Sequence, residues 1–139
     1  MKCFLDANVL FSAANEPSRM HHFIEELQQR HECLTSNYAQ EEAIRNIRAK
    51  RSQWEYGFTL VMQQVAIVQS IDRSIRVEIA LKDRPILATA IDHKCDRLIT
   101  GDKRNFGHLF QKTIQGVTIL TPLQFADELN SNPRAWKVS

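Results

Sequence analysis

The first thirteen residues, MKCFLDANVLFSA (residues 1–13), predict a short buried strand that ends in a carboxylate. Phe4 and Leu5 lead directly into Asp6, and the apolar spacing then changes to that of a helix. A charge at the end of a buried strand costs free energy unless a partner compensates for it. Two interpretations of Asp6 are open at this point: the carboxylate caps the helix that follows it, or it binds a cation.

Alternation of strands and helices continues along the chain. We expect five short apolar strands, at residues 3–5, 33–35, 65–68, 97–100 and 117–120. We expect helices at residues 8–14, 17–29, 37–48, 52–64, 72–81, 84–93 and from 122 onward, with Asn37 as the cap of the third helix and an irregular turn at 101–107. Short apolar strands separated by helices are typical of a parallel sheet covered on both faces, an α/β sandwich.

The size and composition are those of one globular domain. Of the 139 residues, 43% are hydrophobic and 24% charged, and a chain of this length buries a core without disulfides. We expect one domain over residues 1–132 and a C-terminal tail over residues 133–139. The net charge of +2 is too small for an obligate nucleic-acid binder, so any such role must come from local patches.

The cysteines and the apolar runs favour a cytoplasmic protein. Cys3, Cys33 and Cys95 lie far apart and form no CxxC pair, so we expect reduced core thiols and no structural zinc site. Asp6 and Asn8 interrupt the apolar N-terminal stretch, which does not fit a signal peptide. No run approaches the roughly 20 apolar residues of a membrane span.

Four acidic residues lie close to the predicted carboxyl ends of the strands. Asp6 follows the first strand and Asp102 the fourth, while Glu42 lies about two turns into the helix after the second strand and Asp83 precedes the helix that leads to the fourth. Ligands of open parallel sheets bind beyond the carboxyl ends of the strands, so we expect these acids to converge. Clustered carboxylates need a cation, and hard oxygen ligands suit Mg²⁺ or Mn²⁺. The predicted chemistry is metal-dependent hydrolysis of a phosphodiester.

Each acid also has a structural alternative. Asp83 could cap the helix that begins at Arg84, Asp102 could be an ordinary turn residue after glycine, and Glu41 competes with Glu42 for the position that faces the sheet. Other functions of this fold class fit less well. The segment DANVLFSA (residues 6–13) contains no glycine, which excludes a dinucleotide-binding turn.

Four blocks of the sequence together resemble the PIN-domain family. They are LDANVL (5–10), TSNYAQEEAIRNI (35–47), KDRPILATAI (82–91) and LITGDKRNFG (98–107), and their order and spacing match that family. The resemblance implies a three-layer α/β/α sandwich with a parallel sheet of about five strands. It implies an endoribonuclease, a hydrolase of RNA phosphodiesters that depends on Mg²⁺ or Mn²⁺. It also implies the toxin of a toxin–antitoxin pair, a homodimer and a small antitoxin protein as partner.

The resemblance also assigns roles to individual residues. Carried over residue by residue, the catalytic acids of the family fall on Asp6, Glu42, Asp83 and Asp102, with the metal on Asp6, Asp83 and Asp102. Small or amide side chains that support the site fall on Asn8, Ser36 and Thr100.

One position departs from the family pattern. PIN domains often have an acid a few residues after the GD pair, and this chain has Asn105 there. An amide supplies a carbonyl oxygen or orients a water, but it adds no negative charge for a second metal. Asn105 therefore keeps a second function open, that of a PIN-like RNA-binding or regulatory protein with little or no catalysis. A metal titration beside an RNA cleavage assay separates the two.

Basic and aromatic residues suggest the partners. Lys82, Arg84, Lys103 and Arg104 flank the acids and are expected to hold RNA phosphates near the metal. The aromatic residues of one predicted helix, Trp54, Tyr56 and Phe58, add weak support for a homodimer.

Overall fold

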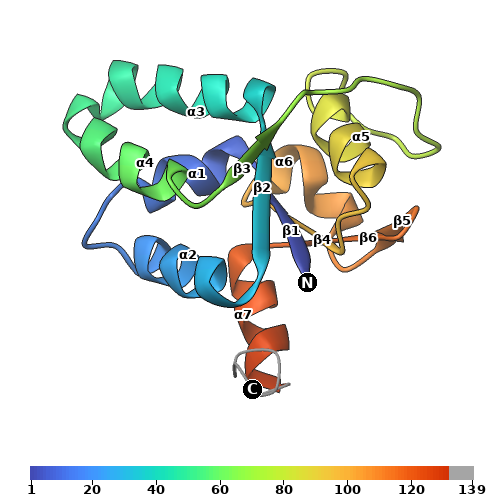
Figure 1. The fold of residues 1–139 in the computed structure, drawn as a ribbon. Coiled ribbons are helices and arrows are strands. Elements are labelled where there is room, and N and C mark those ends of the chain that lie inside the picture. The colour runs from blue at the N-terminus through green and yellow to red at the C-terminus, as the bar shows by residue number, and fades with distance from the viewer. Residues whose placement is uncertain (132–139) are drawn as a thin grey trace.

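A six-stranded sheet forms the middle layer of the computed structural model, which describes residues 1–131 (Figure 1). The strand order is β3-β2-β1-β4-β6-β5. The strands are β1 (Lys2–Leu5), β2 (Glu32–Ser36), β3 (Ala66–Val68), β4 (Arg97–Ile99), β5 (Thr113–Ile114) and β6 (Val117–Leu120). Five of them pair in parallel, as predicted, whereas the two-residue β5 is antiparallel to β6 and was not expected.

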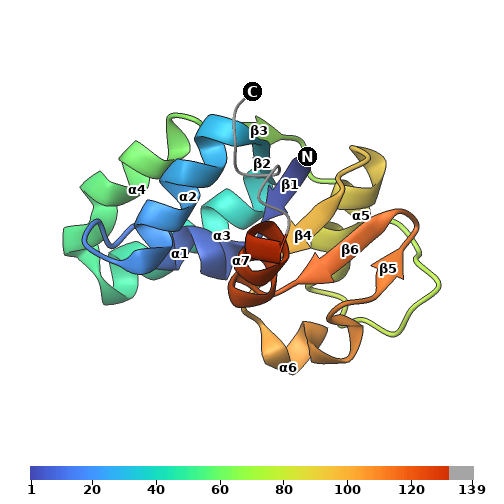
Figure 2. The same cartoon turned by 90° about the horizontal axis from the view of Figure 1, so that it is seen from below.

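Helices cover both faces of this sheet. They are α1 (Ala7–Ala13), α2 (Arg19–Arg30), α3 (Asn37–Lys50), α4 (Glu55–Met62), α5 (Arg84–Asp92), α6 (Lys103–Phe106) and α7 (Pro122–Ser131). Figures 1 and 2 show α1 to α4 gathered on one side of the sheet and α5 on the other. The predicted three-layer arrangement of helices and a mostly parallel sheet is confirmed. The predicted tail at 133–139 lies outside the described residues.

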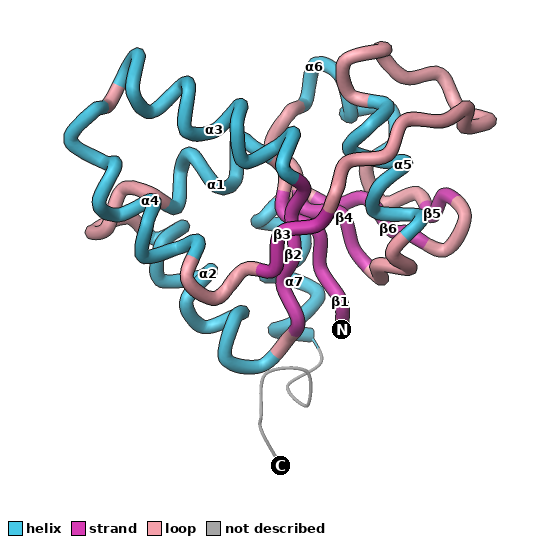
Figure 3. Tube along the Cα trace, turned by 45° about the horizontal axis from the view of Figure 1, so that its top comes forward, coloured by secondary structure: helices cyan, strands magenta, loops and turns pink. Residues whose placement is uncertain are grey.

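The connection between β3 and α5 is a long loop instead of the helix predicted at 72–81 (Figure 3). Ile75, Val77 and Ile79 pack partly against the core, while the residues between them are exposed. This is the two-residue alternation of an extended chain. The prediction was wrong because Ile75 and Ile79 are also four residues apart, a spacing that suits a helix equally well.

Two local predictions around helix starts also need correction. Ser36, not Asn37, caps α3: its hydroxyl accepts from the Ala39 amide at 3.1 Å. The Asn37 side chain instead accepts from the Ser70 amide at 2.8 Å, which holds the start of the long loop. The expected irregular turn after Gly101 is the short helix α6, followed by a 3-10 helix at Gly107–Leu109.

The aromatic residues expected at an interface have different environments. Phe58 is buried in the core, and Trp54 packs against Phe11 with a ring-centroid separation of 5.3 Å. Tyr56 is 67% exposed. The three residues therefore do not form one exposed aromatic surface, and they give the homodimer little support.

No helix within residues 1–131 is long and apolar enough to cross a membrane.

Candidate active site

Asp6 stands where the carboxyl ends of β1 and β4 lie side by side. Leu5 is in register with Ile99, so Asp6 and Thr100 follow their strands at the same level. The Asp6 side chain is buried, with 4% of the residue exposed. Its Oδ1 accepts from the Ala7 amide at 2.7 Å, and its Oδ2 accepts from the Thr100 hydroxyl at 2.8 Å and the Asn8 amide group at 3.2 Å. The helix-cap interpretation of Asp6 is correct at the start of α1.

The electrostatics of Asp6 show that other acids are close to it. Burial raises the pKa of the Asp6 carboxyl to about 6, against the opposing effect of the hydrogen bonds from Thr100 and Ala7. The negative charges of Glu42 and Asp83 add to this rise. A buried carboxylate whose pKa is raised by neighbouring carboxylates is typical of a functional site. Capping therefore does not account for all of the Asp6 environment.

Asp83 has a buried carboxylate oxygen without a hydrogen-bond partner in the described part of the chain. It precedes α5, but its side chain makes no capping hydrogen bond, so the capping interpretation of Asp83 is wrong. Its Oδ2 is buried and has no hydrogen-bond partner among residues 1–131. Burial raises the pKa of the Asp83 carboxyl, with further contributions from Asp102 and Glu42, while Lys82 lowers it. Such an orphaned oxygen beside other acids fits a cation.

Asp102 caps α6 and is tied to Asn105. One carboxylate oxygen accepts from the Asn105 backbone amide at 3.1 Å, and the other accepts from the Asn105 side-chain amide at 2.9 Å. The Asp102 amide donates to the Thr100 hydroxyl at 3.2 Å, and Asn8 accepts from the Gly101 amide at 2.6 Å. Asn8, Thr100 and Asn105 thus hold the ends of β1 and β4 and the start of α6 together.

Helix α3 brings Glu42, and not Glu41, to the acids. Glu42 is half-buried and acts electrostatically on both Asp6 and Asp83, whereas Glu41 is exposed. Ser36 is fully buried at the start of this helix, where its hydroxyl serves as the cap described above.

Tyr38 is a residue of this region that sequence reasoning missed. Its hydroxyl donates to the Lys82 carbonyl oxygen at 2.7 Å, which joins α3 to the turn that carries Asp83. Burial and then the charges of Glu42 and Asp83 raise the pKa of the Tyr38 hydroxyl. No local pattern in the sequence links a tyrosine at 38 to a carbonyl at 82. A contact across 44 residues could have been found only from the fold.

The four expected basic residues differ in their surroundings. Lys82 is exposed and lies close enough to Asp83 to lower its pKa, and Lys103 and Arg104 are exposed on α6. Arg84 is instead occupied by Asp72, whose carboxylate accepts two hydrogen bonds from its guanidinium, at 2.6 and 3.1 Å. Three of the four basic residues, Lys82, Lys103 and Arg104, are therefore exposed, and Arg84 is paired.

The four acids have the right ligand atoms for a hard divalent cation, but their side chains lie too far apart to bind one together. The four acids offer only oxygen atoms, and the Asp83 oxygen is unpartnered. No three acid, histidine or cysteine side chains in the described part of the chain are close enough to hold a metal ion as they lie. The negative charges of neighbouring carboxylates repel each other. In addition, Asp102 accepts a hydrogen bond from the Asn105 side-chain amide.

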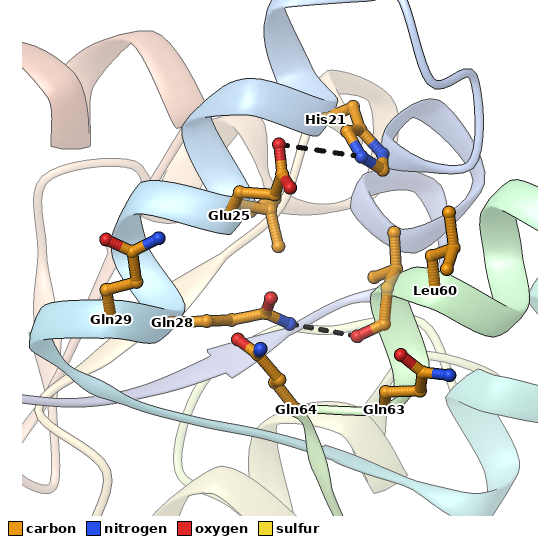
Figure 4. A pocket seen from close by; sticks show the side chains of 9 residues that line it. His21, Glu25, Gln28, Gln29, Leu60, Gln63 and Gln64 are labelled. Carbon is orange, nitrogen blue, oxygen red and sulfur yellow. Dashed lines mark hydrogen bonds and ion pairs between the residues drawn. The ribbon is translucent and has the colours of Figure 1, made fainter.

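A separate small pocket lies between α2 and α4 (Figure 4). Its volume is about 150 Å³, and its walls are largely polar. His21 pairs with Glu25 at 3.7 Å, and the Gln28 amide group donates to the Val61 carbonyl at 2.9 Å. None of the four acids lines it, so it is not part of the candidate active site.

Comparison with known proteins supports the fold. No family model and no curated protein matches the chain. Among solved structures, a chain of VapBC2 from Rickettsia felis, bound to a DNA fragment from their promoter, is 16% identical with a TM-score of 0.65, over 87% of this chain and 98% of that one. VapC20 from Mycobacterium tuberculosis, a sarcin-ricin loop cleaving toxin, is 12% identical with a TM-score of 0.52, over 73% and 91%. At these identities the likeness establishes architecture, and the chain has the PIN-like α/β fold of the VapC toxins.

Proposed function

We propose that this protein is an endoribonuclease that depends on Mg²⁺ or Mn²⁺ and hydrolyses RNA phosphodiesters. The observation that carries the proposal is the buried, unpartnered Oδ2 of Asp83, which lies in a group of acids. Burial, and after it the charges of neighbouring acids, raise the pKa values of Asp6 and Asp83. Removing charges from water without compensation is costly. A divalent cation would supply that compensation.

The acids and the residues around them would have different roles in the reaction. Asp6, Asp83 and Asp102 would hold the cation, and a bound divalent ion neutralises a phosphate and lowers the pKa of an attacking water. Thr100 and Asn8 fix the Asp6 carboxylate through their hydrogen bonds to Oδ2. Glu42, on α3, would accept the proton of the attacking water at its carboxylate. Lys82, Lys103 and Arg104 would bind the phosphates on either side of the scissile bond.

The biological setting follows by analogy with the structural neighbours. VapC20 cleaves the sarcin-ricin loop, and VapBC2 was crystallised on promoter DNA. We extend this to a toxin that acts on single-stranded or structured RNA in the cytoplasm, is held by a small antitoxin protein and forms a homodimer.

The test is cleavage of a sarcin-ricin loop RNA and of total RNA, with Mn²⁺, with Mg²⁺ and with EDTA. The adjacent pair Glu42→Gln and Glu41→Gln provides a matched control, because Glu42 is half-buried and acts electrostatically on Asp6 and Asp83, whereas Glu41 is exposed. Wild type and Glu41→Gln should cleave only with a divalent ion, and Glu42→Gln should cleave at least about 100-fold more slowly, since one proton-transfer group contributes that much. Equal rates for the two variants would contradict the proposal.

The hydrogen bond between Asn105 and Asp102 favours a second candidate. It occupies one Asp102 oxygen with a neutral donor, which weakens the site for a metal. A protein that binds RNA but cleaves none at any Mn²⁺ concentration would be the regulatory, non-catalytic PIN-like protein.

A further inference from the structure

A second hollow is lined by a residue that is hydrogen-bonded to Asp102. Its volume is about 480 Å³, and it lies between the long loop and α6, lined by Glu78, Ile79, Ala80, Arg104, Asn105 and His108. Asn105 connects the two places, because its side-chain amide donates to Asp102 Oδ2 at 2.9 Å. A ligand in this hollow would therefore lie next to a phosphate bound at the acids.

The walls of the hollow are held in place by internal bonds. A ring nitrogen of His108, Nε2, donates to the Glu78 carbonyl oxygen at 2.6 Å and joins the 3-10 helix after α6 to the loop. Ile79 is packed partly against the core. The loop also begins from a fixed position, since Asn37 holds the Ser70 amide and the Thr89 hydroxyl accepts from the Ile71 amide. A hollow with fixed walls is a better binding site than a gap in a free loop.

The side chains of the hollow suit a nucleobase. The His108 ring is exposed although one nitrogen is fixed, and imidazole rings and guanidinium planes are surfaces on which unpaired bases stack. The Arg104 side chain is exposed, forms no hydrogen bond or ion pair within residues 1–131, and is available for stacking or for a phosphate. The Asn105 carbonyl and the exposed Glu78 carboxylate can accept from the amino groups of a base.

Two other hollows among residues 1–131 lack this combination. The pocket between α2 and α4 is lined by glutamines, His21 and Glu25, without lysine or arginine. A shallow hollow of about 350 Å³ between β6 and α7 includes Asp127 and Glu128 and is lined by no lysine, arginine or histidine. Of these hollows, only the one next to Asp102 combines an unpaired cation, an exposed ring and contact with the acids.

We propose that this hollow is a nucleobase subsite, which binds the unpaired base of single-stranded RNA next to the phosphate at the acids. The inference rests on the proposed function for its substrate class, but it makes a separate claim, namely that the protein recognises a base and not only the sugar–phosphate backbone. Affinity for RNA should then depend on His108.

The experiment measures binding by fluorescence anisotropy in EDTA, where no cleavage occurs. The probes are a short labelled single-stranded RNA and an abasic oligonucleotide of the same length and charge. Wild type should bind the base-bearing RNA about 10-fold more tightly than the abasic one, within the range that one stacked base contributes. His108→Ala, which removes the ring, and Ala80→Leu, which fills the hollow from an exposed position, should both lose this preference. The exposed His22→Ala, on α2, should keep it.

Each outcome decides a different claim. Equal binding of the two probes by wild type, no binding of either, or a preference that survives in both variants would overturn the subsite. Normal Mn²⁺-dependent cleavage with no base preference would overturn the subsite alone. A preference that both variants lose, in a protein that cleaves no RNA with Mn²⁺, would leave the subsite standing and overturn the nuclease.

Discussion

The hydroxyl of Tyr38 donates a 2.7 Å hydrogen bond to the carbonyl oxygen of Lys82 and so links the two segments that carry Glu42 and Asp83. One segment is α3 and the other is the turn before α5, in which the Ala80 carbonyl accepts from the Asp83 amide at 2.9 Å. The acids belong to elements that are far apart in the chain. Their separation therefore depends on contacts of this kind as well as on the sheet.

Removing the Tyr38 hydroxyl should slow RNA cleavage more than it affects stability. Tyr38→Phe keeps the ring but releases the Lys82 carbonyl, so we expect a fall in kcat of about 10-fold, as for other partners that orient metal ligands. The free energy of unfolding should fall by only about 0.5 kcal/mol, the low end for one hydrogen bond. Steady-state kinetics and urea unfolding measure both, with the exposed Tyr56→Phe as control. A kcat equal to that of wild type would show that the bond has no part in the site.

The contribution of Asp6 to the stability of the metal-free protein should fall as the pH rises. The pKa of Asp6 is raised from its ordinary value of 3.8 to about 6 in the folded protein. The folded state therefore binds the proton more tightly than the unfolded state, and this contribution to stability is full below about pH 4 and lost above about pH 6. Its size is on the order of 3 kcal/mol. Asp83 shifts in the same direction.

Asp6→Asn isolates this contribution. Asparagine keeps an acceptor for the Ala7 amide but has no charge to titrate. In EDTA, urea unfolding between pH 4 and 7 should show a smaller loss of stability for Asp6→Asn than for wild type. Identical pH profiles for the two proteins would mean that Asp6 is not held in an environment that disfavours its charge.

Adding an acid at position 105 should strengthen metal binding and lower the thermal stability of the metal-free protein. Asn105→Asp replaces the donor to Asp102 Oδ2 with a second carboxylate. The added charge should lower the Kd for Mn²⁺ by about 10-fold, while repulsion from Asp102 should lower the Tm in EDTA. Asn105→Ala frees the Asp102 oxygen without adding charge, so it should lower the Kd by less than about 3-fold. Calorimetric titration measures the Kd for Mn²⁺. Equal Kd values for Asn105→Asp and Asn105→Ala would contradict the prediction that an acid at position 105 strengthens metal binding.

The basic residues should differ in their effect on RNA binding. Lys103→Ala removes an exposed cation beside the acids, and it should weaken RNA binding and reduce the salt dependence of log Kd by about one unit of slope. Arg84→Ala removes a cation that Asp72 already neutralises, so both quantities should change little. Fluorescence anisotropy titrations at several salt concentrations measure the Kd for RNA and its salt dependence. An equal loss in the two variants would show that Arg84 is released from Asp72 when RNA binds.

The sequence was informative where a side chain follows a strand. Asp6 and Thr100 lie together because parallel strands end at one edge, a rule that holds whatever the details of packing. It was misleading for Ile75 and Ile79, where the spacing suits both a helix and an extended chain. Tyr38 could not be predicted because its partner is a backbone carbonyl. The pairing of Arg84 with Asp72 could not be predicted because Asp72, twelve residues earlier, was expected inside a helix.

The most direct test of the account is Mn²⁺ binding by the metal-free protein, followed by electron paramagnetic resonance, for wild type, Asp83→Asn and Glu41→Gln. The account predicts a saturable Mn²⁺ site in wild type and in Glu41→Gln. Asp83→Asn, which keeps the shape of the side chain but removes its unpartnered carboxylate oxygen, should bind at least about 10-fold more weakly, since loss of a direct ligand costs no less than loss of an outer partner. No saturable site in wild type, or equal affinity in Asp83→Asn, would contradict the claim that these acids hold a divalent cation.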